Sequence, residues 1–371
     1  MEFIDLKAQQ EHLKNEIDSG IANVLSHGRY ILGPEVEALE TALKKFGQTD
    51  FAIGCANGTD ALILTLMSWE IGAGDAVFCP SFTYCATAES VAVRGATPIF
   101  VDIDRGTYNM CSKSLRRAIA EIITENLLRP RAIIAVDLFG QSADYPAIKA
   151  IADEFGLKLI ADSAQGFGTT LNDKHPANWA DVTTTSFFPA KPLGCYGDGG
   201  AVLTNDAELA AIIDSAHVHG KGVDKYDNVR LGMNSRLDTL QAAILLPKLA
   251  VFAEEIKMRN IVANRYIDCL SAHVLRTPTV MGGVVSTWAQ FTIEVKDPVD
   301  FGEKLKADGI PTARYYPRPV HMQTAYEHYP CVGGGLPNTQ SCIDNIISLP
   351  MHPYLSENDQ DRVIQIVKQS V

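Results

Sequence analysis

Residues 183–204, TTTSFFPAKPLGCYGDGGAVLT, are the part of the chain that is most informative about its architecture. Two short runs in this stretch, Thr183–Phe187 and Ala201–Thr204, have the composition of β-strands and are bounded by proline or glycine. Lys191 and the glycine-rich turn Gly197–Gly200 lie between them. The stretch therefore predicts two strands joined by an irregular connection that carries one lysine.

Upstream of this stretch, short apolar runs alternate with helical patterns. Strands are expected at Phe51–Cys55, Ala76–Cys79, Pro98–Val101, Ala132–Val136 and Leu157–Ala161, and helices at Asp60–Trp69, Thr87–Val93 and Tyr145–Phe155. Strands that are apolar almost throughout are typical of a mostly parallel sheet with helices on both faces. We therefore predict an α/β fold. In such folds, ligands bind beyond the carboxyl ends of the strands.

Downstream, a long helical pattern extends from about Leu237 to Arg259, and we expect Pro247 to kink it. A chain of 371 residues is long for one domain, since domains usually have about 100–200 residues. We place the boundary in this helix, with a large domain at 1–245 and a smaller α+β domain at 246–371. Within the smaller domain we expect strands at Ala289–Val295 and Thr312–Tyr316 and a helix at Asn358–Gln369.

Composition argues against several functional classes. The net charge of −12 disfavours nucleic acid as a partner, because the chain would repel a phosphate backbone. No apolar run approaches the ~20 residues that span a bilayer, and the N-terminus lacks the apolar core of a signal peptide, so we expect no membrane association and a cytoplasmic location. The eight cysteines form no C-x-x-C pair, which favours reduced thiols. His217 and His219 lack a third ligand, so we expect surface histidines and no metal.

Lys191 is the first candidate for chemistry. Apolar residues precede it and Pro192 follows it, which indicates a partly buried lysine. Burial lowers the pKa of an amine and produces the nucleophile that a Schiff base requires. The alternative is a lysine whose stem is buried and whose charged end reaches solvent. Taken alone, Lys191 favours that alternative.

Asp162 changes this balance, because it ends the apolar run LKLIAD at the predicted carboxyl edge of the sheet. A carboxylate there can pair with a protonated pyridine nitrogen and keep the ring electron-withdrawing. The alternative is a cap for a following helix. An aspartate about 30 residues before a buried lysine, each at the end of its own strand, is a more specific signal than either residue alone.

Other residues could hold a phosphate and an aromatic ring. The segment Ala56–Asp60 lies between a strand and a helix, where free N–H groups such as those of Gly58 and Thr59 bind anions. Its alternative is a plain helix start. Ser186 offers a hydroxyl at a strand end, or is a buried serine bonded to backbone. Tyr84, at a strand-to-helix turn, is equally consistent with a ring-stacking residue and with a core aromatic.

Nine segments of the chain carry a family resemblance. They are GRYILGPEVEALE, CANGTDAL, PSFTYCATAESV, DLFGQSAD, ADSAQGFG, TSFFPAKPLGCYGDGGA, GMNSRLDTLQAAILLPKL, YYPRPVHMQ and SLPMHPYL. Together they resemble the DegT/DnrJ/EryC1/StrS sugar aminotransferases, over essentially the whole chain. The resemblance implies the type I aminotransferase fold and pyridoxal 5′-phosphate (PLP) as cofactor. KPLGCYGDGGA and NSRLDTLQAAILLPKL point to the branch that aminates UDP-2-acetamido-2-deoxy-3-oxo-glucuronic acid for bacterial surface polysaccharide, including O-antigen.

The resemblance also assigns roles to individual residues. Lys191 would bind the cofactor covalently and Asp162 would pair with its ring nitrogen, and both are expected to be catalytic. The residues expected to bind the cofactor are Gly58, Thr59, Tyr84, Asp162, Gln165, Ser186, Lys191 and Asn234. Asn234 would reach the phosphate from the neighbouring subunit, which implies a homodimer with shared active sites. Arg236, Tyr315 and Tyr316 would contact the nucleotide-sugar, and glutamate is the expected amino donor.

Two departures and several alternatives accompany this interpretation. Ala161 stands where the family usually has glutamate before the aspartate, and Tyr315 stands where many members have histidine. Arg236 could equally form a salt bridge at a helix start. A branch that performs dehydration replaces the lysine with histidine, so Lys191 favours transamination. The alternatives are a 4-keto-sugar aminotransferase and, in another class, a PLP-binding regulator. A dinucleotide-dependent oxidoreductase is disfavoured because no G-x-G-x-x-G follows the first strand.

Overall fold

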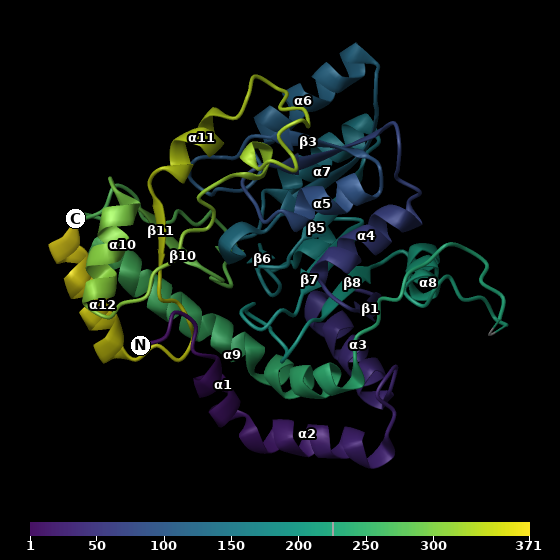
Figure 1. Cartoon of the computed structure of the whole chain (residues 1–371), viewed down its shortest axis with the longest axis horizontal. Coiled ribbons are helices and arrows are strands. Elements are labelled where there is room, and N and C mark those ends of the chain that lie inside the picture. Colours follow the sequence, from purple (N-terminus) through teal and green to yellow (C-terminus); the bar gives the residue numbers. More distant parts are fainter. Residues whose placement is uncertain (225) are drawn as a thin grey trace.

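A seven-stranded sheet forms the centre of the larger part of the molecule (Figure 1). The computed structural model describes residues 1–224 and 226–371. In spatial order the strands are β1 (Phe51–Cys55), β8 (Gly200–Thr204), β7 (Val182–Ser186), β5 (Lys158–Asp162), β4 (Arg129–Val136), β2 (Asp75–Pro80) and β3 (Thr97–Val101). β8 pairs antiparallel with both neighbours, and every other pairing is parallel. The predicted α/β fold with a mixed, mostly parallel sheet is confirmed.

Helices cover both faces of this sheet. One face packs against α6 (Ser112–Glu125) and α7 (Tyr145–Phe155), and the other packs against α4 (Gly58–Ser68) and α5 (Ala86–Val93). Further helices of this part are α1 (Leu6–His12), α2 (Lys14–His27), α3 (Pro34–Gly47) and α8 (Ala207–Ala216). The predicted helices near residues 60, 87 and 145 therefore exist, with ends shifted by at most two residues.

Strand β4 shows why its sequence is apolar without alternation. Ile133 and Ala135 belong to the core against α6 and α7, whereas Ala132 and Ile134 belong to the core against α4 and α5. Successive side chains of a strand point to opposite faces, so a sheet covered on both sides buries every position. All four of these residues have no exposed surface.

The C-terminal part has a hydrophobic core of its own, made of residues between Val262 and Val367. Its elements are the distal half of α9 (Thr239–Leu270), β10 (Phe291–Glu294), α10 (Pro298–Ala307), α11 (Pro337–Ile343), β11 (Ile346–Leu349) and α12 (Glu357–Ser370). Two short strands connect the two parts of the sequence: β6 (Thr170–Leu171), from the first part, pairs antiparallel with β9 (Val284–Val285), from the second. Helix α9 continues through Pro247 and the expected boundary at 245/246, so the division into two domains remains a prediction.

Two expectations about this half of the chain are wrong. The segment Thr312–Tyr316 is not a strand, and Ala313 forms only an isolated bridge with Ser348. Pro311 and Pro317 flank the segment, and proline removes the N–H donors that a ladder needs. The long helix also ends at Leu270 rather than near Arg259.

The expectation for His217 is also wrong. The residue was predicted at the surface, but it is 2% exposed, and its Nδ1 lies 3.1 Å from the carbonyl oxygens of Gly54 and Ser235. A buried imidazole needs such partners, and these two carbonyl groups satisfy its ring. His219 is exposed, as predicted. Within residues 1–224 and 226–371, no group of three or more His, Cys, Asp or Glu side chains could hold a metal ion.

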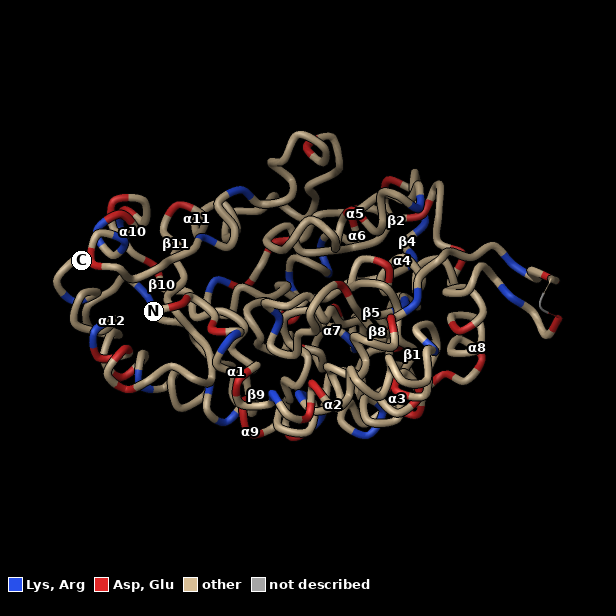
Figure 2. Tube along the Cα trace, turned by 60° about the horizontal axis from the view of Figure 1, so that its bottom comes forward, with Lys and Arg blue, Asp and Glu red and all other residues tan. Residues whose placement is uncertain are grey.

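Lys and Arg are interspersed with Asp and Glu along the whole molecule (Figure 2). All eight cysteines are free thiols. None of the helices in the described part of the chain combines the length and apolar character that crossing a membrane requires.

Candidate active site

A cavity of about 720 Å³ opens at the carboxyl edge of the sheet. Its walls include Val136 at the end of β4, Asp162 at the end of β5 and Ser186 at the end of β7. The start of α4 and residues 83–87 at the start of α5 close one side, and Tyr315 and Tyr316 close another. The volume is in the range of small-molecule sites, and the position is the one expected for ligands of parallel sheets.

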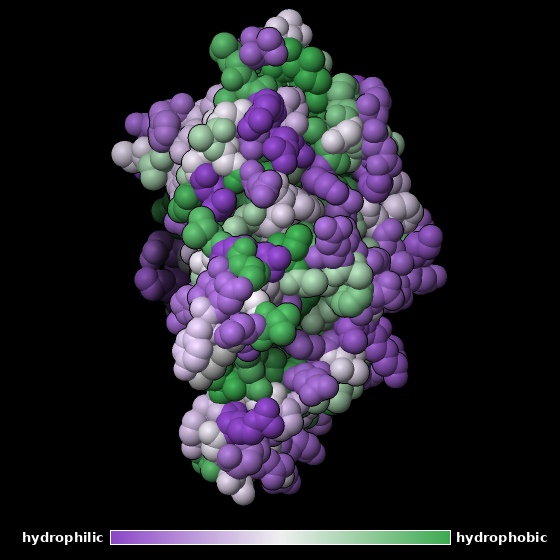
Figure 3. Space-filling view, turned by 90° about the vertical axis from the view of Figure 1, so that its right-hand side faces the viewer, coloured by the Kyte–Doolittle hydropathy of each residue, from purple (hydrophilic) through white to green (hydrophobic). Residues whose placement is uncertain are grey.

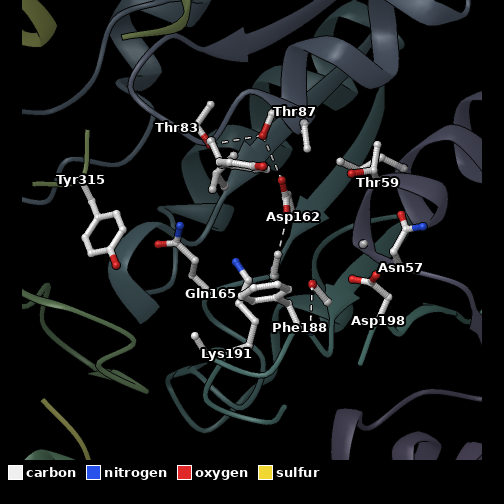
Figure 4. A pocket seen from close by; sticks show the side chains of 18 of the residues that line it. Asn57, Thr59, Thr83, Thr87, Asp162, Gln165, Phe188, Lys191, Asp198 and Tyr315 are labelled. Atoms are coloured by element: carbon white, nitrogen blue, oxygen red, sulfur yellow. Dashed lines mark hydrogen bonds between the residues drawn. The ribbon is translucent and has the colours of Figure 1, made fainter. Parts of the chain in front are cut away.

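Lys191 projects into this cavity from the connection between β7 and β8 (Figure 4). The connection is held by short backbone bonds, since the Lys191 N–H donates to the Phe188 carbonyl at 2.8 Å and the Cys195 N–H donates to the Phe187 carbonyl at 2.7 Å. Lys248 of α9 donates to the Gly194 carbonyl at 2.7 Å. Burial lowers the pKa of Lys191, and the charge of Asp162 opposes that shift. The structure thus supplies an amine on a well-held backbone, and this amine has a reduced affinity for its proton.

Asp162 lies on the same cavity and is only 6% exposed. Its carboxylate accepts a hydrogen bond from the Thr87 hydroxyl at 3.0 Å and one from the Ala164 N–H at 3.2 Å. Burial raises the pKa of Asp162, and the charge of Lys191 together with the hydrogen bonds from Ala164 and Thr87 opposes that increase. Both hydrogen-bond donors are uncharged. A buried carboxylate with neutral donors is well suited to a cationic N–H of a ligand.

The start of α4 forms the third component of the site. Asn57 caps the helix, because its side chain accepts from the Asp60 N–H at 2.8 Å and its carbonyl accepts from the Ala61 N–H at 3.1 Å. The N–H groups of Gly58 and Thr59, at the first two helical positions, therefore remain for an anion. Ser186 lies directly opposite, since a Cβ on Gly58 would be 2.7 Å from the Ser186 Cβ.

Tyr84, Gln165 and Tyr316 line the same cavity. Tyr84 is 56% exposed and its ring is free to contact a ligand, which excludes the core-aromatic alternative. Gln165 is fixed at both ends of its amide: its Oε1 accepts from the Phe139 N–H at 2.8 Å, and its Nε2 donates to the Tyr316 hydroxyl at 2.9 Å. The structure therefore brings together every expected cofactor residue except Asn234.

Asn234 and Arg236 do not line the cavity of their own chain. Asn234 is exposed, and the Arg236 guanidinium donates to its side-chain oxygen. The pair lies on the segment between α8 and α9, part of which extends from the body of the molecule (Figure 1). Of the three residues expected to contact the nucleotide-sugar, Tyr315 and Tyr316 reach the cavity and Arg236 does not.

Sequence reasoning missed several residues of the site. Thr87 bonds Asp162, Asp198 lies near the start of α4, and Ile4 and Gln290 belong to segments far away in sequence. Thr87 lies within PSFTYCAT, where a hydroxyl one helical turn after Thr83 is a usable signal. For Ile4 and Gln290 the sequence offers no such signal, because tertiary packing alone brings them to the cavity.

These residues fit a PLP molecule. A pyridine N–H matches the buried carboxylate of Asp162, and a phosphate matches the α4 N-terminus with Ser186. The exposed ring of Tyr84 offers a stacking face, and Lys191 supplies an amine for covalent attachment.

Comparison with known proteins agrees with this description. Residues 11–368 match the DegT/DnrJ/EryC1/StrS aminotransferase family. The chain is 48% identical, over 96% of both sequences, to UDP-2-acetamido-2-deoxy-3-oxo-D-glucuronate aminotransferase of Pseudomonas aeruginosa. It superimposes with a TM-score of 0.98 on a DegT DnrJ EryC1 StrS aminotransferase from Brucella abortus, at 50% identity and covering 100% and 99% of the two chains. A Bacillus subtilis structure with bound cofactor PMP is 30% identical, with a TM-score of 0.86 and coverage of 96% and 81%.

Proposed function

The chain belongs to the DegT/DnrJ/EryC1/StrS aminotransferase family, and from this premise we propose that it transfers an amino group from glutamate to the keto group of a nucleotide-linked sugar. The cofactor is PLP. The proposed acceptor is UDP-2-acetamido-2-deoxy-3-oxo-glucuronic acid, and the proposed role is the synthesis of O-antigen or a related surface polysaccharide in the cytoplasm. The 48% identity to the Pseudomonas aeruginosa enzyme supports this acceptor.

One observation carries the proposal: the amine of Lys191 and the carboxylate of Asp162 face the same cavity and influence each other's pKa. A regulator that only binds the cofactor would not require this pair. We therefore favour an enzyme over the PLP-binding regulator, and Lys191 favours transamination over dehydration.

The chain's own residues have distinct tasks. PLP, when bound, supplies an electron-withdrawing ring that stabilises negative charge at the carbon undergoing proton transfer. The Nζ of Lys191 takes this proton and returns it at a neighbouring atom, which requires the neutral amine that burial favours. The Asp162 carboxylate holds a proton on the ring nitrogen. The N–H groups of Gly58 and Thr59 and the Ser186 hydroxyl bind the phosphate and fix the ring against Tyr84.

A homodimer with shared active sites is part of the proposal, because the charges of a single cavity do not suit its ligands. Asp60, Asp162 and Asp198 line the cavity, and Lys191 is the one cation among its lining residues in the described chain. Glutamate, phosphate and a hexuronate are all anions and need further cations. Arg236, which lies outside its own cavity, could provide one to the other subunit.

The surface near Arg236 has the character of an interface. Tyr30, Ile31 and Leu32 are between 41% and 48% exposed, and the Tyr30 carbonyl accepts from the Thr239 N–H, three residues after Arg236. The face that carries the projecting segment shows apolar side chains among polar ones (Figure 3). Exposed apolar clusters of this kind mark interaction sites, which supports contact with a second copy.

The decisive experiment presents the purified protein with glutamate and a panel of acceptors: UDP-3-keto-uronate, UDP-4-keto-hexose and dTDP-4-keto-hexose. Products are identified by mass spectrometry. We expect amination of the 3-keto-uronate with at least tenfold preference. Amination of a 4-keto-sugar alone would replace the proposed acceptor with the alternative, and absence of any aminated product with a yellow, cofactor-loaded protein would support the regulator.

A further inference from the structure

Lys248 is a buried lysine of α9 that binds the connection between β7 and β8. It is only 1% exposed. Its Nζ donates to the Gly194 carbonyl at 2.7 Å and lies 4.2 Å from the centroid of the Tyr196 ring, within the range of a cation–π contact. Burial of a charge is costly unless such partners compensate for it. The segment that these two contacts hold begins three residues after Lys191.

A second residue of α9 binds the same segment. The Gln241 Oε1 accepts from the Tyr196 N–H at 2.9 Å. Gln241 and Lys248 are seven residues apart in the helix, which is about two turns, so both lie on one face of it. Between them in sequence, Leu245 belongs to the same hydrophobic core as Leu193 of the connection. Helix α9 therefore holds this segment both by hydrogen bonds and by apolar packing.

Gly194 links this segment to the backbone of Lys191. A Cβ on Gly194 would lie 2.5 Å from the Pro189 carbonyl oxygen and 2.8 Å from the Phe188 carbonyl oxygen, so backbone packs directly on backbone and only glycine fits. The Phe188 carbonyl also accepts from the Lys191 N–H at 2.8 Å. A displacement of Gly194 must therefore disturb the turn from which the Lys191 side chain starts.

The amine of Lys191 has two tasks in the proposed reaction. Its nitrogen condenses with the aldehyde carbon of PLP, which forms a C=N bond and releases one water, and the freed amine later moves a proton between neighbouring atoms. Both tasks need reacting atoms at about 3–3.5 Å, and a displacement of about 1 Å can lower a rate about 100-fold. Because the backbone determines where a side chain can reach, contacts that fix the backbone of Lys191 bear on both tasks.

We propose that Lys248 is a positioning residue for Lys191, because its bond to Gly194 holds the connection where the Lys191 amine can reach the cofactor. The inference rests on the proposed function, in which Lys191 binds PLP and transfers the proton. Since Lys248 acts through the backbone, it should affect the steps that use the Lys191 amine. Phosphate binding at Gly58 and Ser186 should be unchanged.

Lys248→Met tests this role, because methionine is of similar length but has no N–H donor. The first measurement uses the cofactor-free protein without substrate. PLP is added, and its covalent attachment is followed by absorbance and by mass after borohydride reduction. We expect attachment to slow about tenfold or more. Pyridoxamine phosphate (PMP) carries an amine in place of the aldehyde and cannot bond to Lys191, so its Kd should stay within twofold of wild type.

The second measurement uses the cofactor-loaded protein and follows the two half-reactions separately by absorbance, with glutamate in one and the UDP-3-keto-uronate in the other. The same amine moves the proton in both half-reactions. We therefore expect the rate at saturating substrate to fall about 10- to 100-fold in each of them, while KM stays within threefold of wild type.

Gln360→Met is the matched control. Gln360 is 3% exposed, and its Nε2 donates at 2.7 Å to the carbonyl of Val262, which also belongs to α9. The control therefore removes a buried hydrogen bond of the same length from the same helix, but in the C-terminal part of the chain. Both variants should lower Tm to a similar extent, and only Lys248→Met should slow the steps that use Lys191.

Several results would overturn the inference. One is attachment of PLP to Lys248→Met within threefold of the wild-type rate, and another is equal slowing in Gln360→Met. A weakened Kd for PMP that accounts for the slower attachment, or a rate loss in one half-reaction alone, would place the effect elsewhere than in the Lys191 amine. If Lys248→Met does not fold, Gln241→Leu, which removes the second contact, is judged by the same criteria. If the wild-type protein binds PMP but forms no covalent bond with PLP, or aminates no sugar, the proposed function fails instead.

Discussion

Gly58 and Ser186 pack closely across the site, and this contact leads to a quantitative prediction for Gly58→Ala. A Cβ at position 58 would lie 2.7 Å from the Ser186 Cβ and 3.3 Å from its Cα and Oγ. Carbon atoms in ordinary contact are about 3.5–4.0 Å apart. The start of α4 and the end of β7 must therefore separate by about 1 Å, since neither neighbour is a flexible side-chain end.

This displacement acts on the donors proposed to bind the cofactor phosphate. A hydrogen bond of about 2.9 Å that lengthens by about 1 Å is lost. Bonds to charged groups contribute about 1.5–3 kcal/mol each, so losing one or two of them costs about 3 kcal/mol. We expect Gly58→Ala to weaken PLP binding roughly 100-fold, because about 1.4 kcal/mol corresponds to a factor of ten.

Titration of the cofactor-free protein with PLP, followed by absorbance, measures this change. The fold should survive, because Gly58 is the first residue of α4 and alanine is favourable in a helix. Gly282→Ala is the matched control, since nothing lies within 4 Å of the position its Cβ would take. A Kd for Gly58→Ala within threefold of wild type, or an equal loss in Gly282→Ala, would refute the reasoning.

Three further substitutions address the chemistry and the packing. Lys191→Ala removes the amine, so we expect loss of the absorbance of covalently bound cofactor. Turnover should decrease at least 1000-fold, which lies in the upper part of the range for acid–base catalysis. Full transaminase activity would refute this role. Asp162→Asn keeps the shape but cannot carry the charge that holds a proton on the ring, so we expect cofactor binding to persist and kcat to fall about 100-fold, measured by steady-state kinetics. Burial lowers the pKa of His175 from its ordinary 6.5 to about 3. Between these two values the unfolded chain binds a proton that the folded protein does not bind, so the free energy of unfolding decreases as pH falls from 6.5 towards 3. His175→Asn keeps an acceptor for the Ala177 N–H and removes the group that titrates. In that pH window we expect the slope of unfolding free energy against pH to decrease by about 1.4 kcal/mol per pH unit, as measured by urea unfolding at several pH values. An unchanged slope would contradict this role of His175.

The central sheet was predictable because its physical signal is local. Each strand must bury both faces, which leaves a continuous apolar run such as Ile133–Val136. The runs of β4, β5 and β7 end at the cavity. Asp162 and Ser186 could therefore be placed at one edge from their positions at strand ends. The same reasoning placed Gly58 and Thr59 at a helix start.

The remainder of the site could not be predicted in this way. Thr312–Tyr316 resembled a strand in composition, but prolines on both sides prevent a ladder, and the segment instead brings Tyr315 and Tyr316 to the cavity. His217 looked like a surface residue because the carbonyls that satisfy its ring come from Gly54 and Ser235, which no local pattern reveals. Gln290 reaches the site through a backbone crossing whose partners are about 150 residues apart.

This contrast has a consequence for how such an enzyme acquires its specificity. Several groups that fit the cofactor, namely Gly58, Asp162 and Ser186, lie on strand ends and a helix start, where the rules of the fold dictate their positions. The groups that face the rest of the cavity, Gln290, Tyr315 and Tyr316, lie on irregular segments held by long-range contacts. Such segments tolerate substitution and can be reshaped while the sheet is unchanged. Chains with the same sheet edge can therefore share one reaction and differ in the sugar they aminate, and substitutions that change the acceptor should be sought on these segments rather than around Lys191.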